Sequence, residues 1–336
     1  MNPKTSSTKI RKSNNPKTNI DRTAGLPIEM KDYLSELEEL RRSINYIRVT
    51  TYALQKFNKS CNGIGVLAVN DDTIKKFLKD LNQEELGDRT VTDYIRSIAR
   101  FYSFLIETRK YGLIFNPVTR LSKRLDNKRQ QTKRPIKTPE EIAKFIKGIH
   151  NPRDRAVVIL LAKTAIRNGE LVALNVEDID FDKETININK HIADHTTNAI
   201  KKGRKNGVET LIPLDDETLR ALKFYLKIRK NNLNEALFIS NNGNRLYAQD
   251  IIRIVKEWSV KTKTCIDTTD IEKKIVPHFF RAWATYTLQM AGLNPSIVDY
   301  IRGDVANTIR GFYFNQVLPF EVIKKDYLNA VPKFGI

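Results

Sequence analysis

Hydrophobic residues recur at helical spacing through most of the chain, in two regions that a polar, basic stretch separates. In the first region, apolar side chains return every three or four residues over 30–40, 74–81 and 95–105, which is the spacing that buries one face of a helix. Asn116-Pro117 ends the third pattern, because the residue before a proline disfavours helical geometry. The pattern predicts a small all-helical domain over residues 25–117, with its Phe and Tyr positions in the core.

The second region combines strong helix signals with a single β pattern. Thr138-Pro139-Glu140-Glu141 is a capping box with proline at the first helical position, and residues 155–167 are apolar nearly all round, which is typical of a helix buried at a domain centre. Isoleucines alternate with polar residues over 186–192, and 207–215 is expected to be the partner strand. Further helices are expected at about 216–229, 248–261, 278–292, 294–303 and 319–330. The pattern predicts a mainly helical domain with a small β-hairpin over residues 138–336.

Charge indicates the partner. The 336 residues carry 58 Lys and Arg against 39 Asp and Glu, a formal net charge of +19, so an acidic partner is expected, nucleic acid first. The first 20 residues hold five basic and no acidic side chains, and we interpret 1–24 as a flexible basic arm, either a solvated tail or a DNA contact. Residues 118–137 hold eight basic side chains and one acidic one. They are expected to form an interdomain linker that lies along a phosphate backbone.

Several classes of protein are excluded by what the sequence does not contain. No apolar stretch approaches the roughly 20 residues that span a bilayer, and the polar N-terminus does not resemble a secretory signal. Cys61 and Cys265 are the only cysteines, which argues against a disulfide framework and favours a reducing cytoplasm. His191 and His195 are the only close histidine pair and are expected at the surface. Neither a metal site nor a cofactor is predicted.

Two segments carry cationic side chains that are candidates for binding an anion. Arg167 ends a buried apolar helix in the stretch 165–171, where a charge must be paired or used; a structural ion pair with Glu170 is the alternative. A second segment, 201–207, is a lysine-rich loop between the two expected strands. Its alternative interpretation is a solvated loop tip.

Two further segments complete the set. His278 and Arg281 stand three residues apart on an expected helix, so they share a face and could grip one phosphate together with Arg167. Gly303-Asp304 is followed, nine residues after Asp304, by Tyr313. Each signal is weak alone, since a lone tyrosine usually belongs to a core and a helix-start histidine is common.

Together, and in this order, the segments resemble the tyrosine recombinase (integrase) family, which includes lambda-integrase-like and Xer-like members, archaeal and viral ones among them. The family pattern falls on Arg167, on a hairpin lysine before Ile212-Pro213-Leu214, on His278 with Arg281, and on Tyr313. The resemblance covers the whole chain in outline. It implies a mainly α fold with a small antiparallel β-sheet in the C-terminal domain, arranged as a two-domain, C-shaped DNA clamp.

The sequence departs from the family pattern at two positions. Ala165 replaces the usual glycine, which is a mild change, but Asp304 replaces a histidine that donates to a phosphate oxygen. An ionised aspartate only accepts hydrogen bonds and repels a phosphate. We therefore expect Asp304 to face away and to orient Arg281 or Arg302, with Arg302 or a water as the donor. This substitution also leaves open a slow or inactive member.

The catalytic lysine of the loop is not decided by spacing. Lys202 matches the Lys-Gly-x-Lys pattern of the family best, Lys205 stands at the more usual distance before Pro213, and Lys201 is the third choice. The loop is longer than the family's usual one, so distance does not settle the order. We place Lys202 first and keep Lys205 as a supporting candidate.

The resemblance implies a reaction that needs neither metal nor ATP. Tyr313 would attack a DNA phosphodiester and form a 3′-phosphotyrosyl link that conserves the bond energy. Arg167 and Arg281 would stabilise charge on the non-bridging oxygens, and His278 would take the tyrosine proton or bind the phosphate. The hairpin lysine would protonate the leaving 5′-oxygen.

The expected partners are double-stranded DNA and other copies of the chain. By resemblance, a homotetramer assembles on paired DNA sites, with a monomer or weak dimer in their absence, and the helix at 319–330 packs on a neighbouring protomer or else on its own domain. DNA contacts are expected from basic residues of the helical domain, the linker and the loop. These are Arg96, Arg100, Arg120, Lys123, Arg124, Lys128, Arg129, Lys133, Arg134, Lys201 and Arg204.

Other functions remain open on the sequence alone. A DNA-binding protein that keeps the fold without the chemistry is favoured by Asp304. A type IB topoisomerase-like enzyme would use the same tyrosine chemistry without site preference, and a metal-dependent nuclease would lose activity in EDTA. RNA binding fits the charge, but the sequence shows no RNA-recognition motif.

Overall fold

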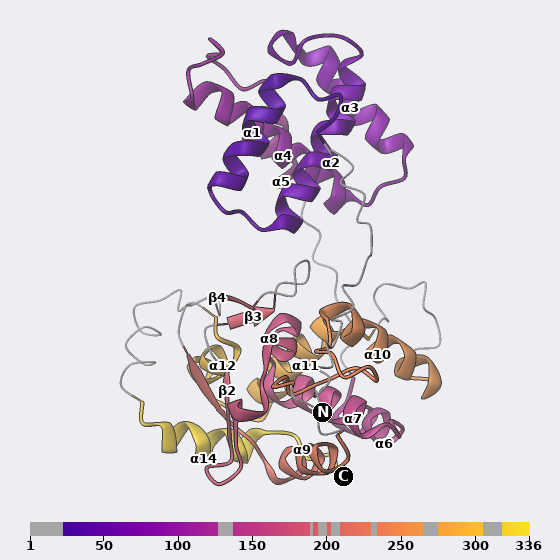
Figure 1. The fold of residues 1–336 in the computed structure, drawn as a ribbon, viewed down its shortest axis with the longest axis vertical. Coiled ribbons are helices and arrows are strands. Elements are labelled where there is room, and N and C mark those ends of the chain that lie inside the picture. The colour runs from indigo at the N-terminus through magenta and orange to yellow at the C-terminus, as the bar shows by residue number, and fades with distance from the viewer. Residues whose placement is uncertain are drawn as a thin grey trace, which may run out of the picture. The chain divides into compact units, whose positions relative to one another are not determined.

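The computed structural model describes residues 23–126, 137–188, 191–193, 200–202, 209–229, 234–264, 275–304 and 318–336. The chain divides into two compact units, Met1–Gln131 and Thr132–Ile336 (Figure 1). Each unit has its own hydrophobic core. The described residues are mainly helical with small antiparallel sheets in the second unit, which confirms the expected fold class.

The N-terminal unit is helical throughout its described residues. Three of its helices follow the apolar patterns seen in the sequence, and two more, α2 and α5, were not predicted. A short 3₁₀ turn, η1, precedes α3. The elements are α1 (Ile28–Glu39), α2 (Ile44–Cys61), η1 (Val66–Ala68), α3 (Asp71–Gln83), α4 (Asp88–Glu107) and α5 (Thr119–Asp126).

Aromatic side chains from three helices meet in the core of this unit. Phe57 of α2 packs edge-on against Phe77 of α3 and Tyr102 of α4. The Tyr102 hydroxyl donates a 2.9 Å hydrogen bond to the Val66 carbonyl of the η1 turn, so its polar end is satisfied although the ring is buried. The expectation that the Phe and Tyr stripe of α4 is core is confirmed, because Phe101 and Tyr102 are fully buried.

The segment assigned to the linker from its charge, 118–137, begins inside this unit. Val118 is fully buried in the core, and Thr119–Asp126 forms α5 against α4. The Asn116 side chain caps the turn before it by accepting a 2.9 Å bond from the Val118 N–H. Residues 127–136 lie outside the described residues.

The C-terminal unit is organised around a helix that is apolar on every side. This helix, α7 (Pro152–Thr164), has nine consecutive buried residues, 156–164, and packs against five other helices. Sequence patterning predicted its central position. The other helices are α6 (Pro139–Lys147), α8 (Asn168–Ala173), η2 (Val176–Asp178), α9 (Asp216–Ile228), α10 (Ala248–Lys261), α11 (Pro277–Met290), α12 (Pro295–Arg302) and α14 (Phe320–Ala330).

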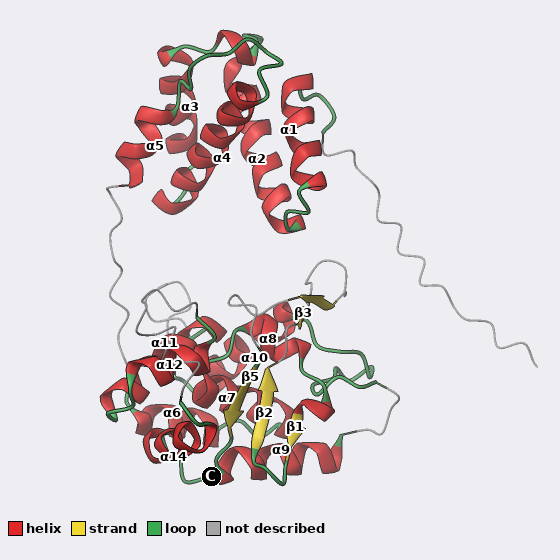
Figure 2. Cartoon of the chain, turned by 90° about the vertical axis from the view of Figure 1, so that its left-hand side faces the viewer, coloured by secondary structure: helices red, strands yellow, loops and turns green. Residues whose placement is uncertain are grey.

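The expected hairpin is present and has a third strand on one edge. β1 (Ile179–Asp180), β2 (Thr185–Ile188) and β5 (Thr210–Pro213) form an antiparallel sheet in the order β1-β2-β5, and Figure 2 shows these strands side by side among the helices. Ile186 opposes Ile212 in the register. Both are fully buried, so the sheet's inner face belongs to the core.

A second pair of strands extends the hairpin. β3 (His191–Ala193) pairs antiparallel with β4 (Ile200–Lys202), and His191 stands opposite Lys202. Lys201 and Lys202, expected in a loop, therefore belong by their backbone to a strand. Lys205 and the rest of the lysine-rich segment after residue 202 lie outside the described residues.

A buried ion cluster ties α7 to the start of α9 and to the chain's last residues. The Lys163 ammonium, fully buried, lies 2.5 Å from Asp215 and 2.6 Å from Glu217. Glu217 also accepts backbone hydrogen bonds from Phe334, Gly335 and Ile336. Burial would raise the pKa of each carboxyl, but the Lys163 charge and its hydrogen bonds outweigh burial and hold both pKa values below their usual range.

The C-terminal helix α14 packs on its own unit. Ile323, Tyr327 and Ala330 are buried, and the Tyr327 hydroxyl donates a 3.0 Å hydrogen bond to the Lys163 carbonyl. The sequence left open whether this helix packs on a neighbouring protomer or on its own domain. In the structure it packs on its own unit, because its narrow apolar stripe covers the core next to β5.

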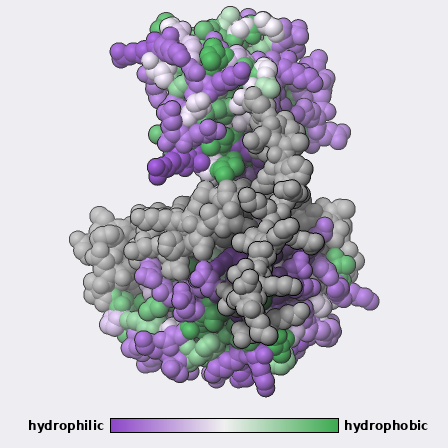
Figure 3. Space-filling model, in the orientation of Figure 1, coloured by the Kyte–Doolittle hydropathy of each residue, from purple (hydrophilic) through white to green (hydrophobic). Residues whose placement is uncertain are grey.

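The faces visible in Figure 3 are mainly hydrophilic, with apolar residues scattered among them, as is normal for a folded surface. Within the described segments, no helix combines the length and the apolar character needed to cross a membrane.

The Lys163 cluster predicts a pH-dependent stability defect. Lys163→Met leaves two buried carboxylates without their cation and is expected to lower the free energy of unfolding by about 3–5 kcal/mol near pH 7. Burial then raises both folded-state pKa values above the unfolded ones, so the defect shrinks as the pH falls toward 4 and the carboxyls protonate. Urea unfolding at several pH values measures this.

The matched control is Lys333→Met, since Lys333 lies 3.3 Å from Asp215 but its side chain is 59% exposed. It should cost less than about 1 kcal/mol. A Lys163→Met defect that stays constant with pH would show that lost packing, rather than unpaired charge, is responsible.

Candidate functional site

Arg281 is the buried centre of an arginine cluster. It lies on the second turn of α11, and its side chain is 5% exposed. Nη1 donates to the carbonyls of Ala165 at 2.6 Å and Arg302 at 3.1 Å, and Nη2 donates to Asp304 Oδ1 at 2.8 Å. A planar guanidinium can serve three acceptors at once, so these bonds fix its orientation.

Arg167 enters the cluster from the turn between α7 and α8. Ala165 ends α7 in the left-handed conformation (φ 53°), which turns the chain so that Arg167 precedes the first residue of α8. Its Nη1 donates to Glu170 Oε1 at 3.1 Å and to the Arg302 carbonyl at 3.2 Å. Its Nη2 donates to Asp304 Oδ1 at 2.7 Å. Both expected outcomes for Arg167 therefore occur together: it pairs with Glu170 and also lies beside Arg281.

Asp304 joins three arginines. Gly303 ends α12 in the left-handed conformation (φ 62°), and the next residue, Asp304, turns toward α11. One carboxylate oxygen accepts from Arg167 and Arg281, and the other lies 2.7 Å from Arg302 Nε. Arg302 Nη1 donates to the Thr285 hydroxyl of α11 at 2.9 Å.

The electrostatics of the cluster follow from its burial. Desolvation and the neighbouring Arg167 lower the pKa of Arg281 to about 10, so Arg281 stays charged at neutral pH. Burial alone would raise the pKa of Asp304, but the charges of Arg281, Arg302 and Arg167 hold it below its usual range. The carboxylate is therefore ionised and is bound as an anion by three guanidinium groups.

This geometry corrects one expectation. Asp304 does contact Arg281 and Arg302, as predicted, but it does not face away from the groups that would hold a phosphate. Its Oδ1 sits on the Nη2 donors of both Arg167 and Arg281. The physical reason is that two guanidinium groups at close range, one of them buried, need a counter-ion.

The remaining catalytic candidates are placed less completely. His278 is exposed in the first turn of α11, three residues before Arg281. Lys201 and Lys202 are placed by their backbone in β4, while Lys205 lies outside the described residues. Tyr313 also lies outside them, within 305–317. The structure thus brings together Arg167, Arg281, Arg302, Asp304 and Glu170.

The predicted DNA-contacting residues are placed as follows. Arg96 and Arg100 lie on α4, Arg96 3.5 Å from Asp93 and Arg100 over the Tyr46 ring, and Arg120 is exposed on α5. Lys123 and Arg124 are placed in α5 by their backbone. Lys128, Arg129, Lys133, Arg134 and Arg204 lie outside the described residues.

Sequence reasoning missed the groups that orient the arginines. The carbonyls of Ala165 and Arg302 accept from Arg281, and Thr285 accepts from Arg302. Backbone carbonyls leave no signal in side-chain patterns. Thr285 stands one helical turn after Arg281, and this spacing is the only signal that could have identified it.

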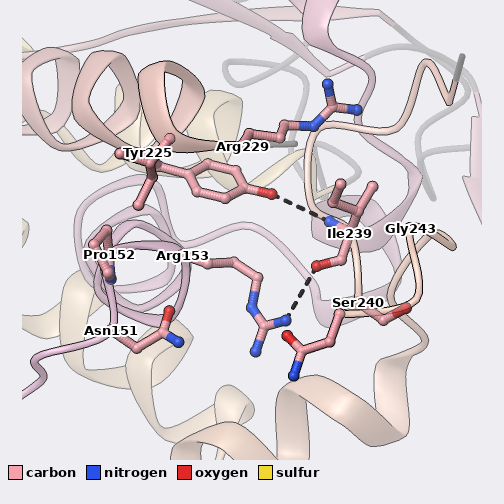
Figure 4. A pocket seen from close by; sticks show the side chains of 10 residues that line it. Asn151, Pro152, Arg153, Tyr225, Arg229, Ile239, Ser240 and Gly243 are labelled. Carbon is pink, nitrogen blue, oxygen red and sulfur yellow. Dashed lines mark hydrogen bonds between the residues drawn. The ribbon is translucent and has the colours of Figure 1, made fainter. Parts of the chain in front are cut away.

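A separate surface hollow has no comparable chemistry. It has a volume of about 240 Å³ and is lined by residues that include Arg153, Tyr225, Arg229 and Ile239 (Figure 4). Arg153 donates to the Ile239 carbonyl at 3.1 Å and pairs with Asp154, while the Tyr225 hydroxyl accepts from the Ile239 N–H. Its polar groups serve to hold the loop around residue 239.

Across the part of the chain that the structure describes, no group of three His, Cys, Asp or Glu side chains could hold a metal ion.

Comparison with known proteins agrees with this architecture. Residues 136–309 match the model of the phage integrase family, which is more than half of the chain. Tyrosine recombinase XerC of Roseiflexus castenholzii is 26% identical over 75% of this chain and 78% of its own length. Tyrosine recombinase XerA of Pyrococcus furiosus is 26% identical over 84% of this chain and 88% of its own.

Solved structures share the fold. The Tn1549 transposon integrase in complex with transposon right end DNA superposes with a TM-score of 0.68 at 21% identity, covering 89% of this chain and 98% of the other. A lambda integrase dimer bound to a core site gives 0.60 at 14% identity, covering 84% and 95%. The chain belongs to the phage integrase family of tyrosine recombinases.

The hydrogen bonds of the cluster predict that substitution of Arg281 destabilises the fold more than substitution of Arg167. Arg281→Lys removes the planar fork that serves two carbonyls and Asp304, and is expected to lower the free energy of unfolding by about 1–3 kcal/mol. Arg167→Lys is the matched control because its side chain is 31% exposed, and it should cost less than about 1 kcal/mol. Equal losses in chemical denaturation would contradict the assignment of Arg281 as the buried centre.

Proposed function

We propose that this chain is a site-specific DNA recombinase that cuts and rejoins strands through a covalent tyrosyl intermediate. One observation carries the proposal. Arg167 lies just before α8 and Arg281 lies on α11, and both donate a hydrogen bond to the same anionic oxygen, Asp304 Oδ1. Two guanidinium groups that share an oxygen acceptor can bind a non-bridging phosphate oxygen in the same way. Arg167 and Arg281 are also the positions where the family pattern has its arginines.

DNA is the proposed substrate. The net charge of +19 favours a polyanion, and the integrase structures that share the fold are DNA complexes. We propose that the helices up to and including α5 form a core-binding domain and that 138–336 form the catalytic domain. In the same proposal 1–24 is the basic arm, and the linker expected at 118–137 is shortened to the part that follows α5. A homotetramer on paired DNA sites is part of the same proposal.

The proposed chemistry balances without a cofactor. The Tyr313 oxygen forms a bond to phosphorus while the bond from phosphorus to the 5′-oxygen breaks, leaving a 3′-phosphotyrosine and a 5′-hydroxyl. The tyrosine proton passes to His278 or to water, and Lys202 supplies the proton that the 5′-oxygen takes up. Arg167 and Arg281 stabilise the charge that develops on the non-bridging oxygens. The reverse reaction with another 5′-hydroxyl rejoins the strands.

A DNA-binding protein without the chemistry is the second candidate. It is favoured by one observation, the ionised Asp304 on the donors of both arginines. A carboxylate at this place repels the phosphate that the reaction needs, so covalent chemistry is the property that separates the two functions.

Covalent capture tests the proposal. In a pool of nicked duplexes of randomised sequence, a nick just downstream of the cleaved phosphate lets the short fragment that bears the new 5′-hydroxyl diffuse away. A protein that cleaves then stays covalently attached to the DNA, and the adduct survives denaturation. The wild type should form this adduct in excess EDTA. Tyr313→Phe lacks the nucleophilic oxygen and should form none while still shifting the same DNA in native gels.

The matched control is Tyr286→Phe, because Tyr286 is an exposed tyrosine of the same unit, on α11. Its adduct yield should equal that of the wild type. DNA binding by the wild type without any adduct favours the second candidate, and an adduct formed by Tyr313→Phe rejects Tyr313 as the nucleophile.

The hairpin lysine has its own test. Loss of a general acid should slow cleavage by about 10²–10⁴-fold, and a substrate with sulfur at the 5′ bridging position should restore the rate because a thiolate leaves without a proton. We expect Lys202→Ala to show this rescue in single-turnover cleavage. Lys201→Ala and Lys205→Ala are the comparisons, and rescue confined to Lys205→Ala would transfer the role to that residue.

A further inference from the structure

The carboxylate of Asp304 uses the donors through which the two arginines can reach an external anion. In Arg281, Nη1 is bound to the carbonyls of Ala165 and Arg302, and in Arg167, Nη1 is bound to Glu170 and the Arg302 carbonyl. The two Nη2 groups both donate to Asp304 Oδ1. The two Nη1 groups share a backbone carbonyl, whereas the two Nη2 groups share an anion. We call the Nη2 pair the shared donor site; Asp304 Oδ1 accepts from both of its members.

Access to this shared donor site leads past the same carboxylate. Arg281 is 5% exposed, whereas Arg167 and Asp304 are 31% and 26% exposed. An anion that approaches from solvent thus meets Arg167 and Asp304 before the buried guanidinium. Two anionic oxygens cannot share the site without strong repulsion at this depth.

We propose that Asp304 is an internal counter-ion that competes with the DNA phosphate for Arg167 and Arg281, so that phosphate binding requires its carboxylate to leave their Nη2 groups. The inference rests on the proposed function, since it takes a phosphodiester as the ligand of this site. Arg302 is the alternative partner for the displaced carboxylate. The other oxygen of Asp304 already lies 2.7 Å from Arg302 Nε, and Arg302 donates a hydrogen bond to Thr285.

The competition links stability to binding. In the protein without DNA, Asp304 neutralises a buried arginine that has a second arginine beside it, and this stabilises the fold. The same contact reduces the population of molecules whose arginines are open to phosphate, and the apparent affinity falls by that fraction. Removing the charge of Asp304 should therefore weaken the fold and strengthen phosphate binding at the same time.

The direction of the change in phosphate affinity distinguishes this proposal from a purely structural role of Asp304. If Asp304 only positioned the arginines, its loss would weaken both the fold and the binding of phosphate. Glu170 remains bound to Arg167 through its side chain and to the Arg167 N–H, so one acidic partner of the cluster survives the change.

The test uses the full chain and two probes, inorganic phosphate and the diester diethyl phosphate. Their dissociation constants come from the rise of melting temperature with concentration at constant ionic strength. Asp304→Asn should melt lower than the wild type without phosphate and bind both probes about tenfold more tightly. Asp304→Glu, which keeps the charge, should bind like the wild type.

Two controls assign the gain to this site. Asp299→Asn removes one negative charge from an exposed position of α12, the helix that precedes Asp304, and should change the dissociation constants less than about twofold. In an Arg167→Gln background, Asp304→Asn should give no gain, because one of the two donors is gone.

The outcomes are decisive in both directions. Unchanged or weaker binding by Asp304→Asn overturns the proposal, and so does an equal gain in Asp299→Asn. If Asp304→Asn does not fold without phosphate, Asp304→Ser is measured instead, and failure of both to fold even in saturating phosphate overturns it too. None of these readouts needs Tyr313, so lack of a covalent adduct would reject the proposed function while leaving the phosphate measurement interpretable.

Discussion

The C-terminal unit is constrained by the need to neutralise a buried arginine that has a second arginine beside it. Arg281 is inside the fold, and Arg167 reaches it from another element. Two guanidinium groups at this distance are stable only with carbonyls and an anion around them. The end of α7, the first turn of α8 and the end of α12 supply those acceptors, and α11 supplies Arg281. The cluster therefore fixes how four elements meet.

The central helix α7 carries another buried cation. Lys163, four residues before Arg167, is neutralised by Asp215 and Glu217, and Glu217 also binds the backbone of the last three residues. Because Lys163 is fully buried within α7, its charge is satisfied by partners far along the chain rather than by water. One central helix thus connects the strand–helix junction, the chain's end and the arginine cluster.

Asp304 shows how a stabilising contact and a functional one can oppose each other. A carboxylate neutralises the arginines but repels a phosphate. The histidine of the family pattern can donate a hydrogen bond to a phosphate but brings no negative charge to the arginines. Functional sites are where local rules for stability are most often broken. Here Asp304 neutralises the cluster in the structure, and under our proposal a bound phosphate has to displace it.

The sequence by itself determined the mainly helical class, the hairpin, the central α7 and the candidate set around Arg167 and Arg281, because periodicity and motif spacing are local properties. It did not predict α2, in whose buried face Thr50, Thr51 and Ser60 interrupt the apolar side chains. Only the tertiary structure decided that α14 packs on its own unit and that Asp304 turns toward the arginines. Both outcomes depend on which charges and apolar faces are buried together, and burial is set by contacts between segments far apart in the chain.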